Sequence, residues 1–123
     1  MTQLIDSLPQ HSKVLLRKLV YNWLPGIDIY MPSYGDLSPM DPRNVPGIEP
    51  LVEWIKANDL PLITAIIVLK ASGKPSSDFF KTFYTGKPGR EKTLFWKDSV
   101  EAVRAFDWTT IIDKPKKFVF GED

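Results

Sequence analysis

Apolar residues recur every three or four positions over residues 12–24, and basic residues occupy the other faces of the implied helix. This spacing predicts an amphipathic helix. Ser12 is a candidate N-cap, and Ser7 offers an earlier start with Pro9 in the first turn. Pro25-Gly26 then predicts where the helix ends.

Three further stretches have helical periodicity. Residues 48–58 carry an apolar stripe, and Pro50 fits there because the first turn of a helix tolerates proline. Residues 78–84 predict a short helix. Residues 90–106 predict a longer one, either continuous or broken at Asp98-Ser99.

The segments that predict strands are shorter than those that predict helices. Residues 62–69 form a β-branched, almost wholly apolar run, which predicts a strand buried on both faces. Residues 27–31 alternate and predict a short edge strand. Residues 118–120 predict either a last edge strand or a disordered end. We therefore expect a small α+β fold with three to four helices and a short antiparallel sheet.

Residues 25–50 hold six of the eleven prolines in the chain. Proline lacks an N–H group and fixes its backbone, so this density excludes a long helix or a central strand there. One helical turn is expected over residues 34–37. The remainder predicts a stiff loop without regular structure.

The composition, with 43% hydrophobic and 25% charged residues, fits one globular domain over residues 1–123. A flexible tail is expected from residue 109. The absence of cysteine excludes disulfides, thiolate metal sites and thiol nucleophiles. The first residues lack the features of a secretory signal, and the longest apolar run is far shorter than the ~20 residues that cross a bilayer. We therefore expect a cytoplasmic protein without membrane contact, and the sequence leaves its oligomeric state open.

Few residues offer catalytic chemistry. General acid–base catalysis at neutral pH usually needs a histidine, or a carboxylate whose pKa burial has moved, and His11 is the single histidine. One imidazole cannot build a histidine metal site. Asp36, Asp41 and Asp107 either cap turns and helices, which is their ordinary role, or meet in space. We expect no catalysis, no metal and no cofactor.

Charge is distributed unevenly along the chain, although the net charge of +1 indicates no partner. Residues 28–59 hold six acidic and two basic residues, a net charge of −4. Residues 70–97 hold seven basic and two acidic residues, a net charge of +5. Six aromatic residues alternate with these bases: Phe79, Phe80, Phe83, Tyr84, Phe95 and Trp96. This mixture is typical of a nucleic-acid groove, and also of a domain whose aromatics form the core while lysines keep the surface soluble.

Short motifs over about residues 34–80 resemble a known family. They are Tyr34-Gly35-Asp36-Leu37, Pro42-Arg43-Asn44-Val45, and Thr64-Ala65-Ile66-Ile67-Val68 before Gly73-Lys74. This pattern is similar to the winged-helix domain of the alkyltransferase-like DNA-binding proteins, and to small uncharacterised bacterial proteins that also carry a late Asp-Trp pair, here Asp107-Trp108. The resemblance implies a winged helix that binds DNA, with Arg43 at a phosphate.

The chain departs from that family in its chemistry. Alkyl transfer uses a Pro-Cys-His-Arg site, and a chain without cysteine cannot perform it. The helix that would face DNA, residues 48–58, carries Glu49 and Glu53 against Lys56 alone, and its acidic side chains repel phosphates. Any nucleic acid should therefore contact residues 70–97 more than this helix.

Two hypotheses of function follow. The first is a non-catalytic, regulatory nucleic-acid-binding protein. Its candidate contacts are Arg43, Lys74, Lys81, Lys87, Arg90 and Lys92. The second is a protein-binding inhibitor or adaptor, of bacterial or phage origin, that acts through its acidic proline-rich loop. Its candidate contacts are Asp36, Asp41, Glu49 and Trp54. An enzyme is the third reading, and the sequence shows no carboxylate pair in unusual surroundings to support it.

Overall fold

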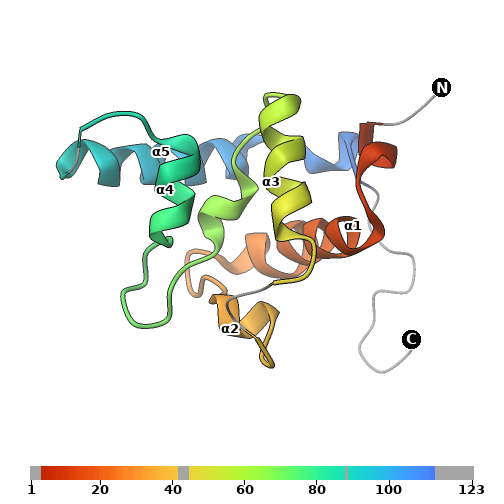
Figure 1. Ribbon diagram of the computed structural model, residues 1–123, viewed down its shortest axis with the longest axis horizontal. Helices are drawn as coiled ribbons and strands as arrows, with labels where there is room; N and C mark the ends of the chain where they lie inside the picture. The colour runs from red at the N-terminus through yellow and green to blue at the C-terminus, as the bar shows by residue number, and fades with distance from the viewer. Residues whose placement is uncertain (1–3, 42–44, 88, 113–123) are drawn as a thin grey trace.

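The computed structural model describes residues 4–41, 45–87 and 89–112, and within these ranges the chain is helical (Figure 1). Its elements are η1 (Leu4–Ser7), α1 (Gln10–Arg17), η2 (Lys18–Trp23), η3 (Leu24–Gly26), α2 (Tyr34–Leu37), α3 (Ile48–Ala57), η4 (Ile63–Ile66), α4 (Ser77–Phe83), α5 (Arg90–Ala105) and η5 (Trp108–Thr110). The η elements are short 3-10 helices, except η2, which is a π-helical turn.

The helices surround one buried segment. In Figure 1, α3 and α4 stand side by side in front of the long helix α5, and α1 with η2 runs below them. Helix α1 packs against α3, and η4 packs against both α5 and η2. All four residues of η4 are buried. A single hydrophobic core therefore has this short 3-10 turn near its centre.

The first helix begins before Ser12. Pro9 is the N-cap of α1, so the earlier of the two predicted starts is closer to the structure. The prediction that Ser12 caps this helix is wrong. Its side chain is fully buried inside the helix, and its hydroxyl donates a hydrogen bond to the carbonyl of Gly47 at 2.7 Å.

Gly47 fixes where α3 starts. Its φ of +82° lies in the left-handed region, which favours glycine. A Cβ on Gly47 would lie 2.6 Å from backbone atoms of both His11 and Ser12. The close approach of α1 and α3 therefore requires the absence of a side chain at this position.

The predicted antiparallel sheet is wrong, and so is the α+β class. Within the described residues the chain contains no strand, only an isolated parallel bridge between Ser33 and Val68. Residues 63–68 of the apolar run are buried as expected, whereas Leu69 is 42% exposed. The N–H groups of Ala65 and Ile67 bond within the run, to Leu62 O and Thr64 O, as in a 3-10 turn. The buried turn packs against helical elements, α5 and η2, and among the described residues the run meets extended backbone at Val68, through the single bridge to Ser33, so no ladder forms.

The other strand predictions have different outcomes. Residues 27–31 form a turn in which the N–H groups of Ile29 and Tyr30 both bond to Gly26 O, so the edge strand is wrong. Residues 118–120 lie outside the described part of the chain. A winged helix needs a β-hairpin, and residues 69–74 form a short turn instead, so the winged-helix fold is not the fold of the described residues.

The expected number of three to four helices is wrong, because the described residues contain five α-helices, but the predicted helical stretches are helical. Helices α2 and α3 form where the sequence placed them, within one residue. Helix α5 runs through Asp98-Ser99 without a break, and the Ser99 hydroxyl donates to the Phe95 carbonyl on the same helix. None of the helices within the described ranges has both the length and the apolar character that a membrane span requires.

Candidate functional site

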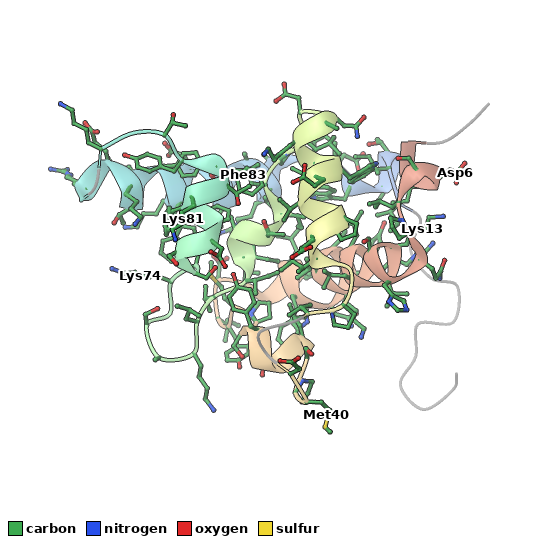
Figure 2. The ribbon with its side chains drawn as sticks, in the orientation of Figure 1. Asp6, Lys13, Met40, Lys74, Lys81 and Phe83 are labelled. Carbon is green, nitrogen blue, oxygen red and sulfur yellow. The ribbon has the colours of Figure 1, made fainter. Side chains whose placement is uncertain are left out.

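The bases of residues 70–97 gather toward one end of the molecule. Lys74 precedes α4 and Lys81 lies on it, whereas Asp6 and Lys13 lie at the opposite end (Figure 2). Lys87 and Arg90 belong to the loop between α4 and α5 and to the first turn of α5, which form the same end (Figure 1). Arg43 lies outside the described residues.

These bases point into solvent. Lys74, Lys81, Lys87 and Arg90 are exposed. Across the described ranges, every ion pair involves Arg104, which bonds to Asp28 at 2.6 Å and approaches Glu101 at 3.6 Å. Charges without protein partners at an exposed end are available to an external anion. Lys92 differs, because it is half-buried and its Nζ lies 4.5 Å from the centre of the Phe80 ring.

The aromatic side chains near these bases pack on one another. Phe79 is 6% exposed, and its ring contacts Phe80, Phe83 and Phe95 with centroids 5.3 to 6.1 Å apart. Trp96 donates its indole N–H to the Ala65 carbonyl at 2.8 Å. These rings join α4 and α5 to η4, so the structure places them in the core rather than on a stacking platform.

The acidic candidate residues are exposed and belong to different elements. Asp36 is tied into α2, where its carboxylate accepts from Ser33 N at 2.8 Å and from the Tyr30 hydroxyl at 2.6 Å. Asp41 is exposed after α2, and Glu49 is exposed on the first turn of α3. Trp54 is 6% exposed in the core, so it is not available as an interface anchor.

The capping carboxylate of Asp36 should titrate at an unusually low pH. The Ser33 N–H bond and then the Tyr30 hydroxyl bond hold the pKa of Asp36 below its ordinary 3.8. A lowered folded-state pKa stabilises the folded protein above that ordinary value, and this contribution disappears as pH falls through the lowered one. We expect the Asp36 carboxyl carbon signal in NMR to have its midpoint below 3.8, and Tyr30→Phe to shift the midpoint partway back up. A midpoint at or above 3.8 would show that the cap does not form.

A groove between α3 and α4 is the feature that sequence reasoning missed. It has a volume of about 460 Å³. Its apolar lining consists of Val45, Ile48, Val52, Phe79 and Phe83. Its charged lining consists of Glu49, Glu53, Asp78 and Lys81. Its hydroxyl groups belong to Tyr34, Thr64, Ser76 and Thr82.

Thr64 is the sequence signal for this groove, because it is the polar residue within an otherwise apolar run. Its side chain is 4% exposed. Among the described residues, its Oγ1 is the buried side-chain polar atom without a hydrogen-bond partner. Such an atom is uncommon, since buried hydroxyls are nearly always bonded.

The remaining candidates for catalytic or metal-binding residues, His11 and Asp107, do not line this groove. His11 is exposed on α1. Asp107 caps η5, accepting from Thr109 N at 3.1 Å, which is the ordinary role expected for it. Over the described ranges, no group of three histidine or acidic side chains is placed to hold a metal ion.

Comparison of the chain with family models, with curated proteins and with solved structures finds no match. The resemblance to the alkyltransferase-like proteins therefore stays a prediction from short motifs.

Proposed function

We propose that this protein is a non-catalytic, regulatory nucleic-acid-binding protein that acts in the cytosol and contacts the phosphate backbone through the end formed by α4 and the start of α5. The observation that carries the proposal is the set of four exposed bases there, Lys74, Lys81, Lys87 and Arg90, for which no ion pair is found among the described residues. Basic side chains that neutralise phosphates release counterions, which drives binding without base contacts.

The proposed binding mode is electrostatic and independent of sequence. The aromatic rings of α4 and α5 are engaged with one another, so stacking on bases contributes little to this mode. Glu49 and Glu53 on α3 repel phosphates and restrict contact to the α4–α5 end. Contact with about four phosphates gives a duplex affinity that falls roughly 100-fold between 50 and 200 mM salt.

The experiment is a fluorescence-anisotropy titration of a labelled 20-nucleotide duplex and its single strand over a salt series. The double variant Lys74→Gln/Lys87→Gln should bind at least tenfold more weakly at 50 mM salt. Its slope of log affinity against log salt should be smaller by about two for the duplex, since two phosphate contacts are lost.

The matched control is Lys13→Gln/Lys18→Gln, which removes the same charge from α1 and the first residue of η2, outside the α4–α5 end. This control should bind within twofold of the wild type. Equal losses in both double variants would mean that net charge alone governs binding, and no binding of either nucleic acid at 20 mM salt would refute the proposal.

A second candidate is the protein-binding inhibitor or adaptor. Met40 favours it, because this side chain is 97% exposed beside Asp41 and projects from the tip of the loop after α2 (Figure 2). An exposed methionine next to an acidic residue is typical of an adaptable interface. A stoichiometric partner that is lost with Met40→Ser/Asp41→Lys but kept with Lys74→Gln/Lys87→Gln would select this candidate over the first.

A further inference from the structure

The groove between α3 and α4 has the size of a small-molecule site. Its volume of about 460 Å³ falls within the range of ordinary ligand pockets. Part of its lining is apolar, with Phe79 buried and Val52 and Phe83 half-buried. An apolar body of one ring or a short alkyl chain can therefore be covered there.

The charge at the rim is negative. Glu49 and Glu53 are four residues apart on α3 and so share one face of that helix, and Asp78 faces the groove from α4. Lys81 is the single base among the lining residues. No ion pair within the described residues joins Lys81 to these carboxylates. Three carboxylates against one ammonium favour a cation and disfavour phosphate.

Thr64 gives an independent reason to place a ligand in this groove. The residue is part of the lining, and its hydroxyl is buried with no hydrogen-bond partner among the described residues. Valine has a similar shape and avoids the cost of an unpaired buried hydroxyl, so a purely structural position would favour valine. Tyr34 and Ser76, also in the lining, already bond to each other at 3.1 Å. A buried hydroxyl without a hydrogen-bond partner, in a groove with acidic lining residues, is expected of a site that binds a polar ligand.

We propose that this groove binds a small organic amine, a primary ammonium carried on an aromatic or alkyl body. The ammonium lies among the carboxylates of Glu49, Glu53 and Asp78. The body of the ligand packs against Val52, Phe79 and Phe83. A polar substituent of the ligand, or a retained water, forms a hydrogen bond with the Thr64 hydroxyl. This site shares Lys81 with the proposed phosphate contacts and otherwise uses different side chains, and its occupant has the opposite charge.

The test is an NMR titration of the full chain with 2-phenylethylamine, 2-phenylethanol and phenylacetate, which share a ring and differ in charge. The amine should produce saturable shifts of the backbone amides of Val52, Thr64 and Phe83, with a Kd below about 1 mM. The neutral alcohol should bind at least tenfold more weakly, and the acid should not bind.

Two variants separate the charge from the hydroxyl. Glu49→Gln/Glu53→Gln should weaken amine binding at least tenfold, whereas Glu91→Gln/Glu101→Gln, which removes the same charge from outside the groove, should leave it within twofold. Thr64→Val should weaken binding threefold or more while the unfolding temperature stays equal or rises. A lower unfolding temperature in this variant would instead assign the hydroxyl a structural role and refute its part in the site.

The titration also distinguishes other occupants. Equal binding of the alcohol and the amine would reduce the groove to a non-specific apolar hollow. Shifts that map outside the groove, or binding of a lysine-containing peptide without binding of the free amine, would overturn the proposal. Loss of nucleic-acid binding in Lys74→Gln/Lys87→Gln with amine binding unchanged would show that the two sites are independent.

Discussion

Gly47→Ala should destabilise the protein by about 3–5 kcal/mol, because it combines a disfavoured backbone conformation with a steric clash. The φ of Gly47 is +82°, a conformation that costs an L-residue roughly 1–2 kcal/mol. The new Cβ would also lie 2.6 Å from backbone atoms of α1, which cannot rotate away as a flexible side chain could. The contact is held from the other side by the Ser12 hydroxyl on the Gly47 carbonyl.

Two other glycines provide matched controls for this variant. Gly73 has a φ of +69°, and a Cβ added there would meet nothing within 4 Å, so Gly73→Ala isolates the backbone cost, at about 1 kcal/mol. Gly26 has neither constraint, and Gly26→Ala should be close to neutral. Urea denaturation of the three variants gives the comparison. If Gly47→Ala costs no more than Gly73→Ala, the α1–α3 contact is looser than the structure indicates.

The contact between α1 and α3 at Gly47 also orients the residues of α3 that line the groove. Gly47 sets the first turn of α3, and Glu49 and Glu53 follow on that helix. Because α1 and α3 are locked at a single close approach, the acidic face of α3 has a fixed orientation toward α4. A long-range packing constraint therefore positions side chains that no local motif could place.

Helix positions were predictable from the sequence because their signals are local. The stripe over residues 48–58 and the capping box of Ser33 and Asp36 each depend on residues within one or two turns. The error at residues 62–69 has a physical cause. An almost wholly apolar run carries no clear periodicity, so it indicates burial but does not distinguish a strand from a buried helical turn.

The candidate site was less predictable than the helices. Counting charges was sufficient to locate the basic segment, but not to show that its aromatic residues pack on one another. The groove is assembled from α3, α4 and η4, together with Tyr34 and Val45, which are distant in sequence. Thr64 is the lining residue that stands out in the sequence, as a hydroxyl in an apolar run. Its significance depends on the residues that surround it in the fold.

Trp108→Ala should cost about 4 kcal/mol, as expected when a large aromatic ring is deleted from a core. The ring is 3% exposed and packs edge to face on Phe106, with centroids 4.7 Å apart. Its indole N–H also donates to the Val103 carbonyl at 2.9 Å, in the last turn of α5, where helix carbonyls lack intrahelical partners. Trp108 therefore both fills the core and terminates the helix.

Trp108→Phe separates these two roles. Phenylalanine keeps most of the ring volume but leaves the Val103 carbonyl unpaired, which should cost roughly 1–3 kcal/mol. The comparison residue is the half-buried Trp23, whose ring centroid lies 5.7 Å from that of Tyr30. Trp23→Ala should lower the free energy of unfolding less than Trp108→Ala does. Urea denaturation measures all three. Equal losses for Trp108→Phe and Trp108→Ala would assign the effect to the hydrogen bond alone, whereas a loss under about 1 kcal/mol for Trp108→Ala would contradict a packed ring at this position. The buried ring also anchors the backbone at Trp108, whose carbonyl accepts from Ile111 N and Ile112 N. The Ile112 carbonyl in turn accepts from the Tyr21 hydroxyl on η2, so loss of the anchoring ring should also loosen this contact.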